Sequence, residues 1–273
     1  MTGVERAAAE IGHTLALDAE RAVQRKKREI FSSEATRSYT VIAEGDSWFS
    51  HPLNTTVIDV LQADGYEIHN LAEAGDTLER MVARKEYKAD LKRGTVKHFL
   101  FSGGGNDFLG EELERCVHGI IPDHVSPGDA PLYVTTEFAK RLNDVRHALS
   151  ILLGDIASLS PSTVLILHGY AYSRPQVAGP YLGKHFEQIG FDLQRHLELA
   201  RAIVRNMVDR FNSNLEALAS SSRLVKYIDF RRTIRQDDDK DWYDYELHPS
   251  PRAAKKMAKL YRPLLDSAQA AVA

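Results

Sequence analysis

A serine that follows the first apolar run of the chain is the strongest candidate for covalent chemistry. The run that begins at Val41 stops at Gly45, and Asp46 and Ser47 follow directly. A run this rich in Val and Ile predicts a buried strand, so Ser47 is expected on the turn beyond its carboxyl end. In an open α/β sheet, ligands bind in the crevice outside the carboxyl ends of the strands. We therefore take Ser47 as the candidate nucleophile.

Three more small, polar stretches lie where a parallel sheet would bring them to the same edge. They are Ala-Gly-Asp at 74–76, Gly-Gly-Asn-Asp at 104–107 and Glu-Leu-His-Pro at 246–249. Taken singly, each has an ordinary structural explanation, because glycine, asparagine and aspartate are favoured in turns and helix caps, and proline in a first helical turn. Their joint order along the chain is far more specific than any one of them.

This order resembles that of the SGNH hydrolases, also called GDSL esterases and lipases, over about residues 40–262. The resemblance implies that Ser47 is the nucleophile and His248 the general base. It also implies an oxyanion hole formed by the N–H groups of Ser47 and Gly75 and the side-chain amide of Asn106. These roles meet the needs of the chemistry, because a serine hydroxyl needs a nearby base and attack on an ester creates an oxyanion that needs preorganised donors.

The third member of a catalytic triad departs from the family pattern. The family's usual aspartate lies three positions before the histidine, and that position here is Tyr245. A carboxylate is wanted there to hold the tautomer of His248 and to stabilise its cation. Asp244 is our first candidate and Glu246 the second. Asp241 lies further off, and a backbone carbonyl could replace any of the three.

Other notable side chains have simpler explanations. Trp48 stands where leucine is the family's commonest residue, and we expect it to alter the pocket wall without changing the mechanism. His51 precedes a proline and is expected to begin the next helix rather than to act as the base. Cys116 has no second cysteine, so a zinc site with His118 and His124 is not predicted, and Cys116 is expected in the core.

Apolar runs and helical patterns alternate along the chain. Strands are expected at 41–45, 67–71, 96–102, 163–168 and 224–229, and helices at 57–61, 136–158, 186–219 and from Pro249 to about 268. Connections too long for hairpins imply right-handed crossovers and a parallel sheet with helices on both faces. The fold class is therefore α/β, and the resemblance implies a flavodoxin-like, three-layer α/β/α arrangement of about five strands. Loops at 117–135 and 169–184 are expected to border the crevice.

The N-terminal segment is expected to be helical. Within residues 4–30, apolar side chains from Val4 to Val23 lie at near-helical spacing and are followed by a basic turn, Arg25-Lys26-Lys27-Arg28. We divide the chain into an N-terminal helical extension, 1–36, and a catalytic domain, 37–273. The extension is interpreted as a packing element or as the contact of a homo-oligomer.

Composition narrows the class of protein. The chain has 273 residues, a formal net charge of -3 and one cysteine, which fits a single α/β domain and excludes an intrachain disulfide. This charge gives no electrostatic footprint for a nucleic acid or an anionic membrane. No run approaches the ~18 apolar residues of a membrane span, and the first residues lack the pattern of a signal peptide. We therefore predict a cytoplasmic protein with no nucleic-acid partner and no membrane span.

The sequence predicts a serine hydrolase that cleaves a small-molecule carboxylic ester through an acyl-enzyme, without metal and without organic cofactor. Small acyl groups, such as acetate on a sugar, and lipid or thioester substrates all remain open. Transfer of the acyl group to an alcohol other than water is an alternative for the same site. A binding protein that keeps the fold without turnover is a second alternative, motivated by Tyr245 at the expected aspartate position.

Overall fold

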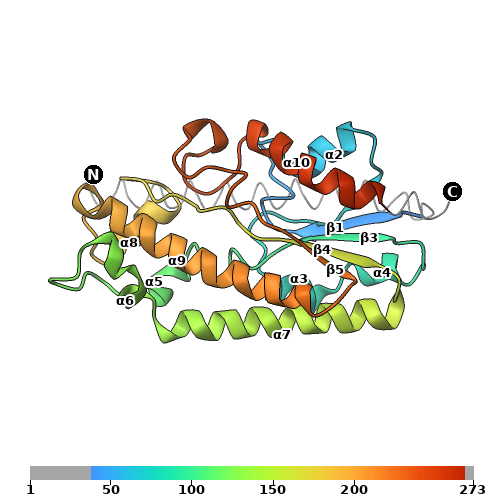
Figure 1. Cartoon of the computed structure of the whole chain (residues 1–273), viewed down its shortest axis with the longest axis horizontal. Helices are drawn as coiled ribbons and strands as arrows, with labels where there is room; N and C mark the ends of the chain where they lie inside the picture. Colours follow the sequence, from blue (N-terminus) through green and yellow to red (C-terminus); the bar gives the residue numbers. More distant parts are fainter. Residues whose placement is uncertain (1–37, 268–273) are drawn as a thin grey trace, which may run out of the picture.

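A single parallel sheet lies at the centre of the computed structural model, which describes residues 38–267 (Figure 1). The sheet order is β2-β1-β3-β4-β5 and every neighbouring pair is parallel. The strands are β1 (Val41–Gly45), β2 (Ile68–Asn70), β3 (His98–Ser102), β4 (Val164–His168) and β5 (Val225–Ile228). The predicted α/β class and its five parallel strands are confirmed. The predicted N-terminal extension, 1–36, lies outside the described residues.

Helices cover both faces of the sheet (Figure 1). One face carries α2 (Val57–Ala63) and α10 (Pro251–Asp266), which pack against each other. The other face carries α3 (Leu78–Arg84), α4 (Lys88–Leu91), α7 (Thr136–Leu159) and α9 (Leu193–Ser220). The right-handed crossover through α2 leads from β1 to β2, in the opposite direction along the sheet to the crossovers that follow β2, β3 and β4. It therefore places α2 on the face opposite α3, α4, α7 and α9.

The periodicity of the sequence explains why the long helices pack as they do. The buried side chains of α7 recur every three or four residues, so they form one apolar stripe toward the core. They include Phe138, Leu142, Val145, Leu149, Leu152 and Ile156.

The single helix predicted at 186–219 is wrong, because the structure has two helices there. α8 spans Leu182–Gln188, and α9 begins only at Leu193. Gly190 has φ +94 between them, and the Asp192 side chain caps α9 by accepting the N–H of Gln194 at 3.1 Å. The break is hidden in the sequence because apolar residues on both sides of it, among them Phe186, are buried in the same core.

The long helices α7 and α9 extend past the sheet beyond the carboxyl ends of the strands (Figure 1). The 24 residues of α7 span about 36 Å at 1.5 Å per residue, whereas a strand of five residues spans about 17 Å. The projecting ends hold short helices that pack against them: α5 (Leu113–Cys116), η1 (Pro127–Asp129), α6 (Ala130–Tyr133) and α8. Of these helices, α8 lies beside the crevice where ligands of such folds bind.

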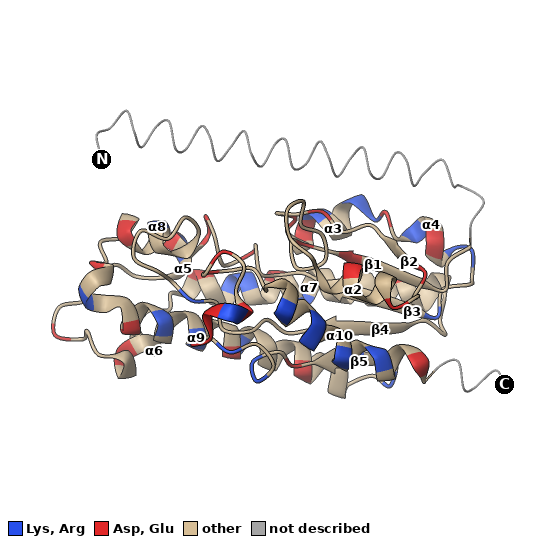
Figure 2. Ribbon diagram, turned by 90° about the horizontal axis from the view of Figure 1, so that it is seen from above, with Lys and Arg blue, Asp and Glu red and all other residues tan. Residues whose placement is uncertain are grey.

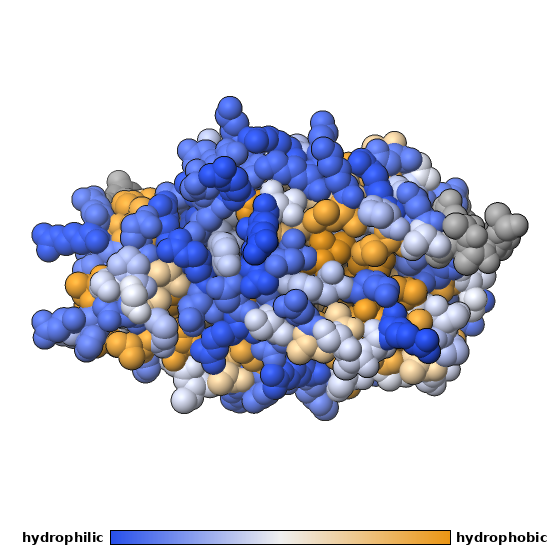
Figure 3. Space-filling model, in the orientation of Figure 1, coloured by the Kyte–Doolittle hydropathy of each residue, from blue (hydrophilic) through white to orange (hydrophobic). Residues whose placement is uncertain are grey.

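The described surface has no single dominant character. Lys and Arg residues are interspersed with Asp and Glu residues over most elements (Figure 2). The face in Figure 3 is mostly hydrophilic, with apolar side chains gathered below α10 over the β5 edge of the sheet. Within residues 38–267, no helix combines the length and the apolar character needed to cross a bilayer.

Candidate active site

Ser47 lies in the turn at the carboxyl end of β1, where the strand order reverses between β2 and β3. This is the position at which open α/β sheets bind ligands. The carbonyl of Asp46 accepts the N–H of Phe49 at 3.0 Å and closes the turn. Glycine is required at position 45, because a Cβ there would lie 2.7 Å from the carbonyl oxygen of Ser102 on β3.

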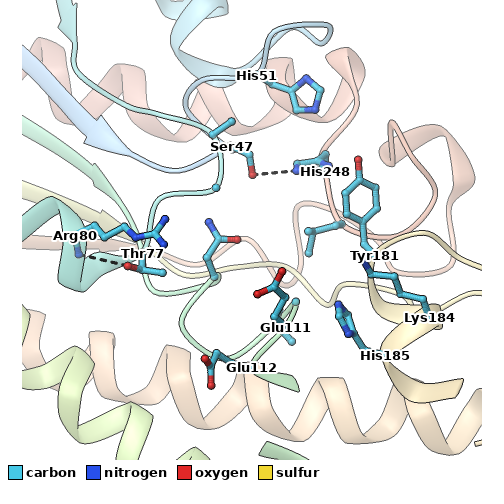
Figure 4. A pocket seen from close by; sticks show the side chains of 16 residues that line it. Ser47, His51, Thr77, Arg80, Glu111, Glu112, Tyr181, Lys184, His185 and His248 are labelled. Atoms are coloured by element: carbon cyan, nitrogen blue, oxygen red, sulfur yellow. Dashed lines mark hydrogen bonds between the residues drawn. The ribbon is translucent and has the colours of Figure 1, made fainter. Parts of the chain in front are cut away.

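His248 reaches Ser47 from the loop between β5 and α10. Its Nε2 lies 3.0 Å from the Ser47 Oγ (Figure 4), and its Nδ1 is hydrogen-bonded to the Asp244 carboxylate. An ionised carboxylate can only accept, so the proton of the neutral imidazole is on Nδ1. The Nε2 lone pair then faces the serine hydroxyl, as a general base requires.

Asp244 is held by the backbone that follows it. Its Oδ1 accepts the N–H groups of Glu246 at 3.0 Å, Leu247 at 2.8 Å and His248 at 3.1 Å. Burial raises the pKa of this carboxyl, but the hydrogen bonds from His248 and the backbone outweigh burial and bring the pKa to about 2. Asp244 is therefore ionised throughout the neutral pH range.

The carboxylates of the other two candidates, Asp241 and Glu246, bond groups other than the ring of His248. Asp241 is buried, bonds the Nζ of Lys256 at 2.6 Å and accepts the N–H of Arg235 at 3.1 Å. Glu246 is also buried and accepts four backbone N–H groups from one loop, those of Gln176, Tyr181, Leu182 and Gly183. Of the three candidates, Asp244 is the one whose carboxylate bonds the ring of His248.

The other two predicted oxyanion donors come from the loops after β2 and β3. Gly75 has φ +78, a left-handed conformation that favours glycine. The N–H groups of Ser47 and Gly75 donate to no other described residue. The Asn106 Nδ2 donates to the carbonyl of Asp76 at 2.8 Å, which fixes the amide. Because an amide nitrogen carries two protons, one N–H of Asn106 is left for a ligand.

Ser47, Gly75, Asn106 and His248 line one pocket of about 290 Å³. Many of the residues that line it have polar or charged side chains (Figure 4). These include Thr77, Arg80, Glu111, Tyr181, Lys184 and His185. Ligand pockets usually measure about 300–1,000 Å³, so this one is small.

Comparison with protein-family models matches residues 45–261 to the GDSL-like lipase/acylhydrolases. The chain belongs to this family. The matched segment contains Ser47, Gly75, Asn106 and His248, so the resemblance inferred from the sequence is confirmed.

Solved structures share the fold at low sequence identity. A Streptococcus pneumonia protein provisionally described as a platelet activating factor is 14% identical, with a TM-score of 0.61, 95% of this chain covered and 99% of that one. The lipase Lip_vut3 from a goat rumen metagenome is 16% identical, with a TM-score of 0.56 and coverages of 83% and 97%. An extracellular lipase from Streptomyces rimosus is 15% identical, with a TM-score of 0.54 and coverages of 84% and 99%. Comparison with curated proteins gave no match.

Trp48 in this GDSL-like chain does not form the pocket wall, and that prediction is wrong. Its side chain is 4% exposed and stacks on His168, with ring centroids 5.6 Å apart. The edge of Tyr170 meets it at 4.9 Å. The turn that presents Ser47 to the pocket directs the next side chain into the core, so the departure from leucine changes packing beneath the site.

His51 does not begin a helix as predicted but lines the pocket. α2 begins at Val57 with Thr56 as its cap, which leaves His51 in a loop. Its ring lies 4.8 Å from the ring of His248 (Figure 4). Burial and the nearby His248 lower the pKa of His51 to about 4, so it is neutral at neutral pH. Its Nδ1 accepts the N–H of Leu53 at 3.2 Å.

Two loops were expected to border the crevice. The loop 169–184 supplies Tyr181 and Lys184 to the pocket, whereas no residue of 117–135 lines it. The second expectation is therefore wrong. The segment 117–135 instead folds into η1 and α6, which lie against α9.

The single cysteine is a core residue. Cys116 is fully buried, and burial raises the pKa of its thiol to about 12. His118 and His124 are exposed. Among residues 38–267, no group of His, Cys, Asp and Glu is arranged to hold a metal ion.

Sequence reasoning missed the polar network beneath Ser47. The Asp46 carboxylate is buried and accepts hydrogen bonds from the Ser102 Oγ at 2.8 Å and from the Tyr170 hydroxyl. Burial raises the pKa of Asp46, although these hydrogen bonds oppose the rise. In the sequence, the position of Tyr170 just after a predicted strand was the feature that could have indicated a place for it near Ser47.

Proposed function

We propose that this chain is a serine esterase that hydrolyses short, polar carboxylic esters through an acyl-enzyme. The observation that carries the proposal is the pair of hydrogen bonds that connects Asp244 through His248 to the Ser47 Oγ. Ser47 and His248 line a pocket that also contains further hydrogen-bond donors. Membership of the GDSL-like lipase/acylhydrolase family supports it.

In the first half of the reaction, the Ser47 Oγ attacks the ester carbonyl carbon while its proton passes to the His248 Nε2. The carbonyl oxygen becomes an oxyanion, which accepts the N–H groups of Ser47 and Gly75 and the remaining N–H of Asn106. Asp244 stabilises the imidazolium. The C–O bond to the alcohol then breaks, the alcohol takes the proton from Nε2, and the acyl group remains on Ser47.

In the second half, a water molecule attacks the acyl carbon and gives a proton to the His248 Nε2. The same donors hold the second oxyanion. The bond from the acyl carbon to the Ser47 Oγ breaks, and the proton returns from Nε2 to the serine. The products are a carboxylic acid and the regenerated enzyme.

The pocket supports short, polar substrates. It holds about 290 Å³ and includes the charged side chains of Arg80, Glu111 and Lys184. Burying a long acyl chain against such groups would remove their water without compensating hydrogen bonds, which is unfavourable. A sugar acetate is one substrate of the expected kind.

Steady-state hydrolysis of nitrophenyl acetate, butyrate and octanoate tests the proposal. We expect kcat/KM to be highest for acetate or butyrate and at least about tenfold lower for octanoate. We expect Ser47→Ala to lower turnover by at least about a thousandfold for every ester. Turnover that survives in Ser47→Ala would overturn the proposal, and a preference for octanoate would overturn the substrate class.

The same assay separates the two alternatives. An acyltransferase would give acylated glycerol in excess of free acid when glycerol is added, whereas an esterase gives free acid. A protein that has lost turnover would give a burst of nitrophenol equal to the protein and nothing after it. That second alternative was suggested because Tyr245 stands where an aspartate is expected. The hydrogen bond between Asp244 and His248 weighs against it, because Asp244 supplies the carboxylate from the neighbouring position.

A further inference from the structure

Tyr170 joins the two loops that carry Ser47 and Asn106. It lies two residues beyond the end of β4. Its hydroxyl donates to the carboxylate of Asp46 and accepts the N–H of Gly105 at 3.2 Å. Asp46 directly precedes Ser47, and Gly105 directly precedes Asn106. One hydroxyl is therefore bonded to the sequence neighbour of the candidate nucleophile and to that of a candidate oxyanion donor.

We call the two hydrogen bonds of the Tyr170 hydroxyl, to Asp46 and to Gly105, the Tyr170 link. At its Asp46 end, the carboxylate is fixed by further hydrogen bonds. The same carboxylate accepts the N–H of Trp48 at 3.0 Å and the Ser102 hydroxyl at 2.8 Å. Its side chain is buried, and hydrogen bonds to a buried carboxylate are stronger than those between neutral groups. The turn around Ser47 cannot shift without disturbing these bonds.

The ring of Tyr170 is equally constrained. Asn212 on α9 accepts the backbone N–H of Tyr170 at 3.1 Å and donates to its carbonyl at 2.9 Å. The ring packs against Phe211, with centroids 5.6 Å apart. A Cβ on residue 105 would lie 2.9 Å from the ring, so glycine is needed there for the loop to come this close. The hydroxyl is thus fixed relative to the sheet and to α9.

We propose that Tyr170 is a positioning residue whose hydroxyl sets the spacing between the Ser47 turn and the Asn106 loop. The inference rests on the proposed function, because that spacing matters only if Ser47 attacks and Asn106 holds the oxyanion. Catalytic groups must be held within about 0.5 Å of their productive geometry, and short backbone loops of this kind need external support to meet that limit.

Tyr170→Phe tests the link, because it keeps the ring and removes the hydroxyl. We expect kcat for nitrophenyl acetate to fall at least about tenfold while KM changes less than about twofold, since a misplaced oxyanion donor weakens the transition state more than the bound ester. Tyr172→Phe is the matched control. The Tyr172 hydroxyl also donates to a carboxylate, that of Asp209 at 2.7 Å, but Tyr172 does not line the pocket. We expect near wild-type kcat for the control.

A double-mutant cycle with Asn106→Ala shows whether Tyr170 acts through the Asn106 loop. If it does, Tyr170→Phe should cost less than about threefold once Asn106 is already alanine. An equal cost in both backgrounds would overturn the inference, as would wild-type kcat in Tyr170→Phe itself. Should Tyr170→Phe not fold, Asp46→Ala removes the acceptor of the Tyr170 hydroxyl. We then expect kcat to fall at least about tenfold with KM changed less than about twofold, and wild-type kcat would overturn the inference.

Two variants, Ser47→Ala and Tyr170→Phe, distinguish a failure of the Tyr170 link from a failure of the proposed function. Hydrolysis that persists in Ser47→Ala removes the esterase and with it the role of Tyr170. Loss of hydrolysis in Ser47→Ala together with wild-type kcat in Tyr170→Phe keeps the esterase and overturns the link alone.

Discussion

Asp244 lies four positions before His248, and its carboxylate bonds both the ring of His248 and the backbone that leads to it. The family pattern places this aspartate one position closer. Tyr245 stands at that position, has φ +65 and turns the chain back toward the Asp244 carboxylate. A left-handed conformation at a residue with a side chain is unfavourable, so the three N–H bonds to the Asp244 Oδ1 must compensate for it.

We expect Asp244→Asn to lower kcat by at least about a hundredfold with little change in KM. An asparagine would favour the wrong tautomer of His248 and would no longer stabilise its cation, and both effects act on the chemical step. Glu246→Gln and Asp241→Asn are the matched controls, and both should lower kcat less. The measurement is kcat and KM for the three variants, with folding checked by circular dichroism. If Glu246→Gln loses the most turnover, or if none loses more than a few-fold, Asp244 is not the partner of His248.

Asp244 should also make the free energy of unfolding depend on pH. Its pKa is lowered from 3.8 to about 2 in the folded protein. A lowered pKa contributes stability above the unfolded value, here on the order of 2 kcal/mol, and this contribution is lost as the pH falls from about 4 to about 2. Urea unfolding between pH 5 and pH 2 should therefore show a smaller loss for Asp244→Asn than for wild type. Parallel losses in the two proteins would contradict the prediction.

Glu246 should matter more for stability than for catalysis. Its buried carboxylate accepts four backbone N–H groups from the loop that carries Tyr181, at 2.7 to 3.2 Å. Glutamine would turn an amide N–H₂ toward these donors and leave some of them unpaired. We expect Glu246→Gln to lower the free energy of unfolding by about 1–3 kcal/mol, measured by urea denaturation. An unchanged free energy of unfolding would show that this loop does not depend on Glu246.

Asn106→Ala should affect turnover and not binding. The Asn106 amide is fixed by the Asp76 carbonyl at 2.8 Å, so its second N–H is preorganised for an oxyanion. Loss of one such donor typically costs about a hundredfold to a thousandfold in kcat. We expect a loss of this size for nitrophenyl acetate with KM within about threefold of wild type. A variant with normal kcat would remove Asn106 from the mechanism.

Much of the fold could be predicted from local patterns. The four residues Ser47, Gly75, Asn106 and His248 are recognisable because each lies in a loop that follows a strand, in a fixed order. Parallel strands bring such loops to one edge of the sheet. The direction in which a single side chain points was harder to predict. Trp48 and His51 differ from the predictions because a one-residue step in a turn decides between core and pocket.

Supporting contacts could not be predicted because they join distant parts of the chain. Tyr170 is 124 positions from Asp46, and Glu246 is 65 positions from Tyr181. Neither pair has a local spacing that would identify it. The break before α9 was hidden for a different reason, since apolar residues continue across Gly190 and periodicity alone does not locate a turn.

The most direct test of the account is the site and rate of labelling by a fluorophosphonate. The oxygen of an activated serine attacks its phosphorus, the P–F bond breaks and fluoride leaves. The phosphonyl group stays on the serine, so the position of the adduct identifies the nucleophile. Peptide mapping by mass spectrometry should find one phosphonyl group, on Ser47, and labelling should be absent in Ser47→Ala and at least about a hundredfold slower in His248→Ala. An adduct on another residue, or labelling that survives in Ser47→Ala, would contradict Ser47 as the nucleophile.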